Sequence, residues 1–265
     1  MEAMMKPGIE GVMAKTTKTK SNAPLLIILC VLIAAVFGGW WLYSFSKPGS
    51  NTSGIATKPS PTTGQTTQTV PPDAPPGANP PNQSGSATAS VTLEEFADFQ
   101  CPHCAVTHPI LNEIKSIYGS RIKFIFRNFP WEMHDKSYDA ATAAEAAGMQ
   151  GKFWDMQNML FTNQRAWTAD PNYKQIWKDY AQKIGLNINK WEEDVAGTGA
   201  KLRVDDDKKR GKAIGVAVTP SLYMNGQAVP FTELNVDGLR KIIDAELQKS
   251  SSQDPAPAAN INSTK

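Results

Sequence analysis

The alternation of apolar and polar residues predicts strands and helices between residues 91 and 247. Strands are expected at four places: 91–99, 122–129, 221–225 and 227–231. The last two are joined by Asn225–Gly226, a dipeptide typical of tight hairpin turns. The first two enclose a helix that begins at the cysteine motif and ends near Tyr118, where Gly119 follows as a stop.

Helical periodicity dominates the region between the second and third strands, at about residues 135–214. Its segments are the alanine-rich stretch 137–149, a stretch marked by Phe153, Met156 and Leu160, an apolar stripe from Tyr173 to Ile184, and two segments from about Asn189 to Ile214. A last helix is expected at 236–247. The order is β-α-β, a helical insertion, then β-β-α. A crossover favours parallel strands and a hairpin antiparallel ones, so the fold class is α/β with a mixed sheet.

The N-terminal part of the chain has a different pattern. Residues 21–46 carry no charged side chain and hold a run of ~20 apolar residues, enough to cross ~30 Å of hydrocarbon as a helix. Lysines are more frequent before this run than after it, which places residues 1–20 in the cytoplasm and everything after Lys47 outside. A cleaved signal peptide is the alternative, but its apolar region is usually only ~7–15 residues, so we expect an uncleaved transmembrane anchor.

Residues 47–89 hold nine of the nineteen prolines and no aromatic residue. Such a segment buries too little apolar surface to offset its ordering entropy, so a disordered Pro/Ser/Thr-rich linker is predicted there. The globular domain is then expected at 90–249. The polar tail 250–265 is predicted to be disordered.

Composition restricts the chemistry. A net charge of +2 gives no electrostatic support for nucleic-acid binding. Of the three cysteines, Cys30 lies in the apolar run, and Cys101 and Cys104 form a CxxC motif. A scaffold held by several disulfides is excluded, and the motif indicates a metal site, a redox site or a structural disulfide.

The metal-site and structural-disulfide interpretations are weaker than the redox interpretation. A zinc site would need two more ligands, and a second CxxC is missing. A c-type haem would need histidine where Ala105 stands. A purely structural disulfide across so short a loop would add little stability. We therefore expect redox chemistry and no metal.

The motif Cys101-Pro102-His103-Cys104 lies where a strand gives way to a helix. Proline suits the first helical turn, so Cys101 is placed at the helix start and Cys104 one turn on, on the same face. Free backbone N–H groups and the helix dipole there stabilise a thiolate, and His103 could add a donor or a positive charge. The pKa of Cys101 should therefore be low, which makes the disulfide form oxidising. Cys104 would be the more buried, resolving partner.

Two further features fit the same site. A cis peptide bond at Thr219–Pro220 beside the motif would expose the Thr219 backbone to an extended substrate, although an ordinary trans proline is commoner. Glu95 precedes Cys101 by six residues. If it points inward it could relay a proton to Cys104, with Glu94 facing out; alternatively, both are solvated charges.

Four stretches together resemble the DsbA family of thioredoxin-fold disulfide oxidoreductases: EEFADFQCPHC, FIFRNFPWEMH, GKFWDMQNMLF and GVAVTPSLYMNG. The resemblance implies a thioredoxin-like sheet with an inserted helical domain. It also implies that Cys101 is the sulfur attacked by substrate, that Cys104 resolves, that Thr219–Pro220 is the cis-proline loop, and that Glu95 is a buried acid. The Pro-His dipeptide matches strongly oxidising members, and the redox-active disulfide would be the only redox group, without a cofactor.

The leading hypothesis is a membrane-anchored, extracytoplasmic thiol:disulfide oxidoreductase. It would donate its disulfide to reduced secreted or membrane proteins and be recharged by a membrane quinone-linked partner. A reductase or isomerase on the same scaffold is the first alternative. A non-catalytic peptide-binding or chaperone module is the second.

Overall fold

The computed structural model describes residues 69–253. The predicted cytoplasmic segment, the anchor at 21–46, linker residues 47–68 and tail residues 254–265 lie outside this range. Among residues 69–253, no helix has both the length and the apolar character needed to cross a membrane.

A five-stranded mixed sheet forms the centre of the described domain, in the order β1-β3-β2-β4-β5. The strands are β1 (Asn82–Gly85), β2 (Val91–Ala97), β3 (Ile122–Asn128), β4 (Ser221–Met224) and β5 (Gln227–Ala228). Strands β2 and β3 are parallel, and all other neighbours are antiparallel. The mixed sheet predicted from the pattern is thus present.

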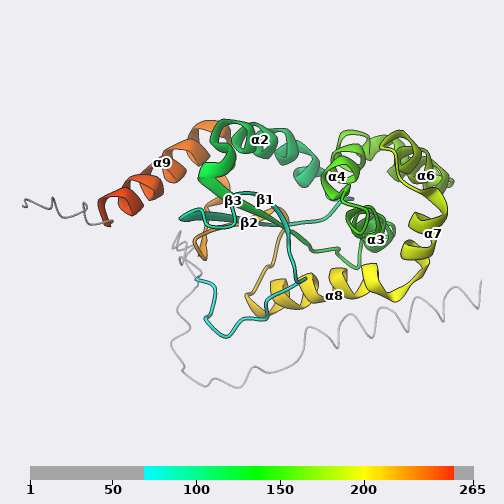
Figure 1. Cartoon of the computed structure of the whole chain (residues 1–265), viewed down its shortest axis with the longest axis horizontal. Coiled ribbons are helices and arrows are strands. Elements are labelled where there is room, and N and C mark those ends of the chain that lie inside the picture. The colour runs from blue at the N-terminus through cyan, green and yellow to red at the C-terminus, as the bar shows by residue number, and fades with distance from the viewer. Residues whose placement is uncertain (1–68, 254–265) are drawn as a thin grey trace, which may run out of the picture. The chain divides into compact units, whose positions relative to one another are not determined.

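Helices cover both faces of this sheet (Figure 1). Helix α2 (Pro102–Tyr118), which connects β2 to β3, lies with the C-terminal helix α9 (Val236–Gln253) on one face. Helix α8 (Thr198–Ala213) lies on the other. Because β2 leads directly into α2, the cysteine motif is placed at the end of the sheet where β2 stops.

The helical insertion occupies the chain between β3 and β4. Its helices are α3 (Ser137–Gly148), α4 (Phe153–Thr162), α5 (Gln164–Ala169), α6 (Tyr173–Lys183), α7 (Ile188–Ala196) and α8. The alanines of α3 are buried on all sides, and their small side chains let α4, α7 and α8 pack closely around it. These bounds correspond to the insertion expected at about 135–214.

Two predicted boundaries near the C-terminus are wrong. The strand expected at 227–231 ends at Ala228, because Pro230 has no N–H for pairing and a 3₁₀ turn follows at Phe231–Glu233. Helix α9 continues to Gln253, past the expected start of the tail. Near this end of the helix, the hydroxyl of Ser250 donates to the carbonyl of Glu246 at 3.0 Å.

The predicted domain start at residue 90 is also wrong. Residues 69–81, here called the strap, cross the α8 face from the β5 edge to β1. The strap begins with Val70 N–H donating to the Gly226 carbonyl at 2.8 Å, beside a bridge from Thr69 to Gln227. β1 then pairs with β3, so the last part of the predicted linker is a strand.

Buried and half-buried side chains distant in sequence bind the backbone of the strap. The Ala78 N–H donates to Asp207 at 2.8 Å, and Arg127 donates to the Ala78 carbonyl at 2.9 Å. Arg210 donates to the carbonyl of Pro75 at 2.8 Å. These partners supply the enthalpy that the composition of the strap lacks, so it is ordered without a large apolar core of its own.

Glu94 belongs to the same buried charge cluster, and its expected solvent exposure is wrong. It does lie on the opposite face of β2 from Glu95, but α8 covers that face, leaving Glu94 only 6% exposed. Burial alone would raise the pKa of Glu94. The guanidinium groups of Arg210 and Arg127 outweigh that effect and hold this pKa below its usual value.

Candidate active site

Cys101 stands where β2 ends and α2 begins. It is the N-cap of α2, with extended backbone angles, and Pro102 follows as the first helical residue. No side chain caps this helix and its first turn holds no acidic residue, so backbone N–H groups are free to face the sulfur. Cys101 is 6% exposed, Cys104 is fully buried, and both are free thiols. The geometry predicted for the motif is therefore present.

The pKa values of the two thiols are shifted in opposite directions. The pKa of Cys101 is lowered to about 5, mainly by a hydrogen bond with the Cys104 thiol, which outweighs desolvation by burial; the Thr219 side chain and the backbone N–H groups of Cys104 and His103 make smaller contributions in the same direction. Burial, and then its interaction with Cys101, raises the pKa of Cys104 well above its ordinary value. At neutral pH the pair is therefore one thiolate and one thiol.

The peptide bond between Thr219 and Pro220 is cis, and it lies beside the motif. The Cys101 thiol donates to the Thr219 carbonyl at 3.3 Å. The loop expected to hold substrate is thus in contact with the sulfur expected to react. Its pairing with an extended substrate stays a prediction.

His103 is exposed on the first turn of α2. Its ring packs edge-on against Phe231, with 6.2 Å between ring centroids. It helps to lower the pKa of Cys101 through its backbone N–H. The imidazole therefore lies at the outer rim of the site.

Glu95 is buried on the α2 side of β2, as the inward alternative predicted. Burial raises its pKa to about 8, and the positive charge of Lys115 opposes this shift. The charge of Glu95 in turn contributes to the raised pKa of Cys104, so the two groups are close enough to interact. A carboxyl group that holds its proton near neutral pH is suited to proton transfer with a buried thiol.

Lys115 is a site residue that sequence reasoning missed. Its amine lies 4.5 Å from the ring centroid of Trp154 and 5.1 Å from that of Phe124, and burial lowers its pKa. A signal existed, because Lys115 follows Cys104 by eleven residues, or three helical turns, on the same face of α2.

The loop after β3 contributes Trp131, a second residue that was missed. Its indole N–H donates to the Thr219 hydroxyl at 2.9 Å. Its backbone N–H donates to the buried carboxylate of Asp98 at 2.8 Å, which also contacts His134 at 2.7 Å. No pattern in the sequence indicates these contacts, which join segments far apart along the chain.

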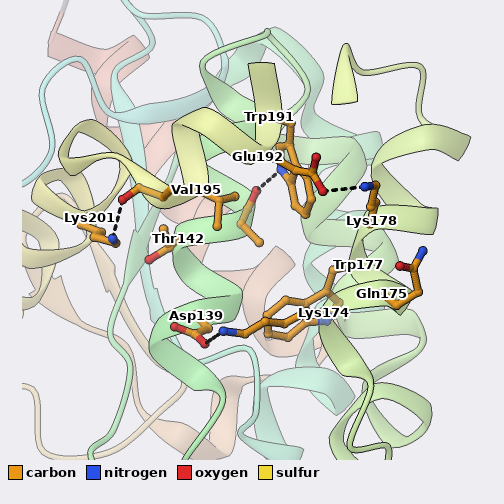
Figure 2. Close-up of a pocket in the computed structure, with 12 residues that line it drawn as sticks. Asp139, Thr142, Lys174, Gln175, Trp177, Lys178, Trp191, Glu192, Val195 and Lys201 are labelled. Atoms are coloured by element: carbon orange, nitrogen blue, oxygen red, sulfur yellow. Dashed lines mark hydrogen bonds and ion pairs between the residues drawn. The ribbon is translucent and has the colours of Figure 1, made fainter. Parts of the chain in front are cut away.

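Within residues 69–253, no group of three or more His, Cys, Asp or Glu side chains is arranged to hold a metal ion. A hollow of about 500 Å³ lies in the helical insertion, between α3, α6 and α7 (Figure 2). Trp177, Trp191 and Val195 form apolar walls, and Lys174 pairs with Asp139 at its rim. This hollow contains neither cysteine, so it is separate from the redox site.

The pKa of Cys101 predicts how the reduced protein reacts with a neutral alkylating reagent. The rate at Cys101 should follow the thiolate fraction, with its midpoint near pH 5, and fall as pH drops below that value. Mass spectrometry of iodoacetamide-treated protein across a pH series measures the alkylation rate of Cys101. Cys104→Ala should move the midpoint upward, because it removes the largest stabilising contact. A wild-type midpoint at the ~8.5 of free cysteine would contradict the expectation.

Comparisons with known proteins agree with this geometry. A thioredoxin family model matches residues 80–245. The oxidised form of BdbD from Bacillus subtilis has a similar structure, with 25% identity and a TM-score of 0.57 over 66% of this chain and 99% of BdbD. The thiol-disulfide exchange protein alpha-DsbA2 from Wolbachia pipientis shares the fold at 22% identity, with a TM-score of 0.54 over 63% of this chain and 87% of that protein.

Curated relatives include much longer proteins. The Na⁺/H⁺ antiporter NhaA 1 of Mycolicibacterium gilvum is 35% identical over 146 residues, which cover 54% of this chain and 23% of the antiporter. NhaA 1 of Salinispora arenicola is 31% identical over 145 residues, covering 54% of this chain and 21% of that protein. The chain therefore spans less than a quarter of the length of these relatives.

Proposed function

Since this chain belongs to the thioredoxin family and is a DsbA-like thiol–disulfide oxidoreductase, we propose that it acts as a dithiol oxidase. Its Cys101–Cys104 disulfide would pass to the thiols of reduced proteins. One observation carries the proposal: the pKa of Cys101 is lowered to about 5 while that of Cys104, one turn away, is raised. This difference makes Cys101 a good leaving group and Cys104 a poor one.

The reaction has two exchanges. A substrate thiolate attacks the sulfur of Cys101, the Cys101–Cys104 bond breaks, and Cys104 leaves with the electron pair. Glu95, whose raised pKa keeps it protonated near neutral pH, supplies the proton that Cys104 then takes up. A second substrate thiolate attacks the substrate sulfur of the mixed disulfide, and Cys101 leaves as a stable thiolate. The substrate loses two electrons and the protein dithiol gains them.

Linkage between the pKa of Cys101 and stability supports this direction of transfer. A thiol whose pKa is depressed by folding stabilises the folded, reduced protein above the unfolded pKa of ~8.5, and this stabilisation is lost as pH falls through the folded value. The folded pKa here is about 5, so part of the stabilisation is present at neutral pH. The disulfide form has no thiolate and gains none of it. Reduction of the disulfide is therefore more favourable than it would be for a cysteine pair with ordinary pKa values, which supports an oxidase.

Exposed apolar side chains near Cys101 support unfolded proteins as substrates. Val218, next to Thr219, is 62% exposed, and Phe231, against His103, is 59% exposed. Such side chains would contact the apolar residues of an extended chain, which a folded protein keeps buried. The clients would be newly translocated secreted or membrane proteins with reduced cysteines.

We further propose that the domain is extracytoplasmic and tethered to the cell membrane through residues 21–46, with a membrane quinone-linked partner restoring its disulfide. The uncharged apolar run and the lysines before it support this location. The position of Thr69 agrees with a tether. Thr69 pairs with Gln227, next to the Asn225–Gly226 turn. This turn lies at the end of the sheet where β2 begins, whereas Cys101 lies at the other end, where β2 stops.

Refolding of a reduced, denatured protein with several disulfides tests the proposed direction. The oxidised protein is expected to form disulfides stoichiometrically, without repairing a scrambled preparation of the same substrate. Repair of scrambled disulfides would indicate an isomerase, and reduction of native disulfides a reductase. Binding of the unfolded chain without any thiol exchange would indicate a peptide-binding module.

A further inference from the structure

We propose that a groove between α2 and the helical insertion binds an extended segment of the substrate polypeptide, beside the cysteine that exchanges with Cys101. The groove, here called the α2 groove, is lined by residues of α2 between 102 and 112 and by residues of α4 and α5 between 158 and 166. Its volume is about 630 Å³, within the ~300–1,000 Å³ usual for binding clefts. The inference rests on the exchange reaction proposed above and holds for either direction of electron transfer.

The α2 groove begins at the redox motif. Helices α2 and α4 lie side by side (Figure 1), and Pro102, the residue directly after Cys101, lines the groove. On the opposite wall, the side chain of Gln164 donates to the carbonyl of Cys101 at 2.9 Å and to that of Phe99 at 2.7 Å. The wall is thus attached to the backbone of the reacting residue, so a chain linked to the Cys101 sulfur lies next to the groove.

The wall formed by α2 is apolar. Pro102, Val106 and Pro109 line it at a spacing that places them on one face of the helix, and all three are exposed, Val106 at 68%. His103, which packs against Phe231, projects from another face of α2. A substrate at Cys101 therefore meets exposed apolar side chains on two sides of the motif.

The remaining lining is rich in side-chain amides, which are those of Asn112, Asn158, Asn163 and Gln164. Like a peptide group, a side-chain amide offers both donors and an acceptor. Among the described residues, the NH₂ group of Asn158 and the side-chain oxygens of Asn112 and Asn163 have no hydrogen-bond partner. Since Pro109 has no N–H, the Ala105 carbonyl also lacks its usual helical donor. These groups match the N–H and C=O groups of an extended backbone.

The charge of the groove restricts the segment that it accepts. Of the described residues that line it, Arg165 alone carries a permanent charge. His108 is buried, and this burial lowers its pKa, so its ring is neutral at neutral pH. The ring nitrogen contacts Asn158 at 3.1 Å and Asn112 at 3.0 Å, which joins α4 to α2. The groove therefore suits an uncharged or acidic segment of an unfolded chain better than a basic one.

The experiment compares a small thiol with a polypeptide thiol. The oxidised full-length protein reacts with glutathione, or with an unstructured peptide of alternating polar and apolar residues that has one central cysteine. Acid quenching and mass spectrometry give the two second-order rate constants, and the measured quantity is the ratio of the peptide rate to the glutathione rate. Glutathione is too short to reach along the groove, so the ratio reports binding of the longer chain.

Ala166→Trp should lower this ratio about tenfold, because the indole fills the groove from its α5 wall. Asn158→Ala should lower it about threefold, since one hydrogen-bonding group is lost from an exposed position. Ala169→Trp is the matched control: this alanine is also exposed on α5 but does not line the groove, so the ratio should equal that of wild type.

A wild-type ratio in both Ala166→Trp and Asn158→Ala would overturn the proposal, and so would an equal loss in Ala169→Trp. Circular dichroism shows whether each variant is folded, and Asn158→Ala keeps the test valid if the larger substitution disturbs α5. Failure of the wild-type protein to react even with glutathione would instead refute the exchange reaction itself, so the two failures are distinguishable.

Discussion

Replacing Cys101 with serine is expected to reduce disulfide exchange to the uncatalysed rate, while Cys104→Ser should trap a mixed disulfide. Serine cannot form a disulfide, so the first variant has no site for the initial exchange. In the second, the Cys101 thiolate can still attack a substrate disulfide, but no neighbouring thiol can then resolve the product. Incubation with a disulfide-bonded test peptide, followed by mass spectrometry without reductant, measures the trapped species.

Cys30→Ser is the matched control, because it removes the third cysteine and leaves the motif unchanged. It should exchange at the wild-type rate. Retained turnover in Cys101→Ser would contradict the role of this residue. Trapping of the peptide on Cys104 in that variant, at a similar rate, would reverse the roles of the two sulfurs.

The second large effect is expected on stability. Replacing Arg127 with methionine should lower the free energy of unfolding by about 3–5 kcal/mol, because it leaves the buried carboxylate of Asp207 without its counter-charge and Glu94 with Arg210 alone. Arg127 donates to Glu94 at 2.7 Å and to Asp207 at 3.0 Å, and these side chains are 8% and 0% exposed. It also binds the carbonyl of Ala78, so the strap loses an anchor as well. Denaturant unfolding followed by circular dichroism measures the change.

Lys190→Ala is the matched control for this measurement. Lys190 pairs with Asp194 at 3.1 Å within one turn of α7, but its side chain is 54% exposed. Exposed pairs of this kind contribute at most about 0.5 kcal/mol, so the control should unfold close to wild type. A loss of less than about 1 kcal/mol in Arg127→Met would show that water or Arg210 compensates for the missing charge.

Local interactions explain why much of the fold could be predicted from the sequence. Apolar periodicity located β2, α2 and β3, and Asn225–Gly226 located the hairpin, where both residues have positive φ angles of 47° and 79°. Cys101 became the N-cap of α2 because proline at the next position favours the first helical turn. Each of these features depends on residues within a few positions of one another.

The sequence by itself determined the order of the elements, the helical insertion, and the cysteine at a helix start. The tertiary structure decided which residues surround that cysteine and where the domain begins. Trp131 and Thr219 are 88 positions apart, Cys101 and Thr219 118, and Ala78 and Asp207 129. Hydrogen bonds over such separations leave no periodic signal, because their partners meet only when the sheet and helices have packed. The strap therefore has the composition of a disordered linker, and it becomes ordered only through hydrogen bonds to buried charged side chains.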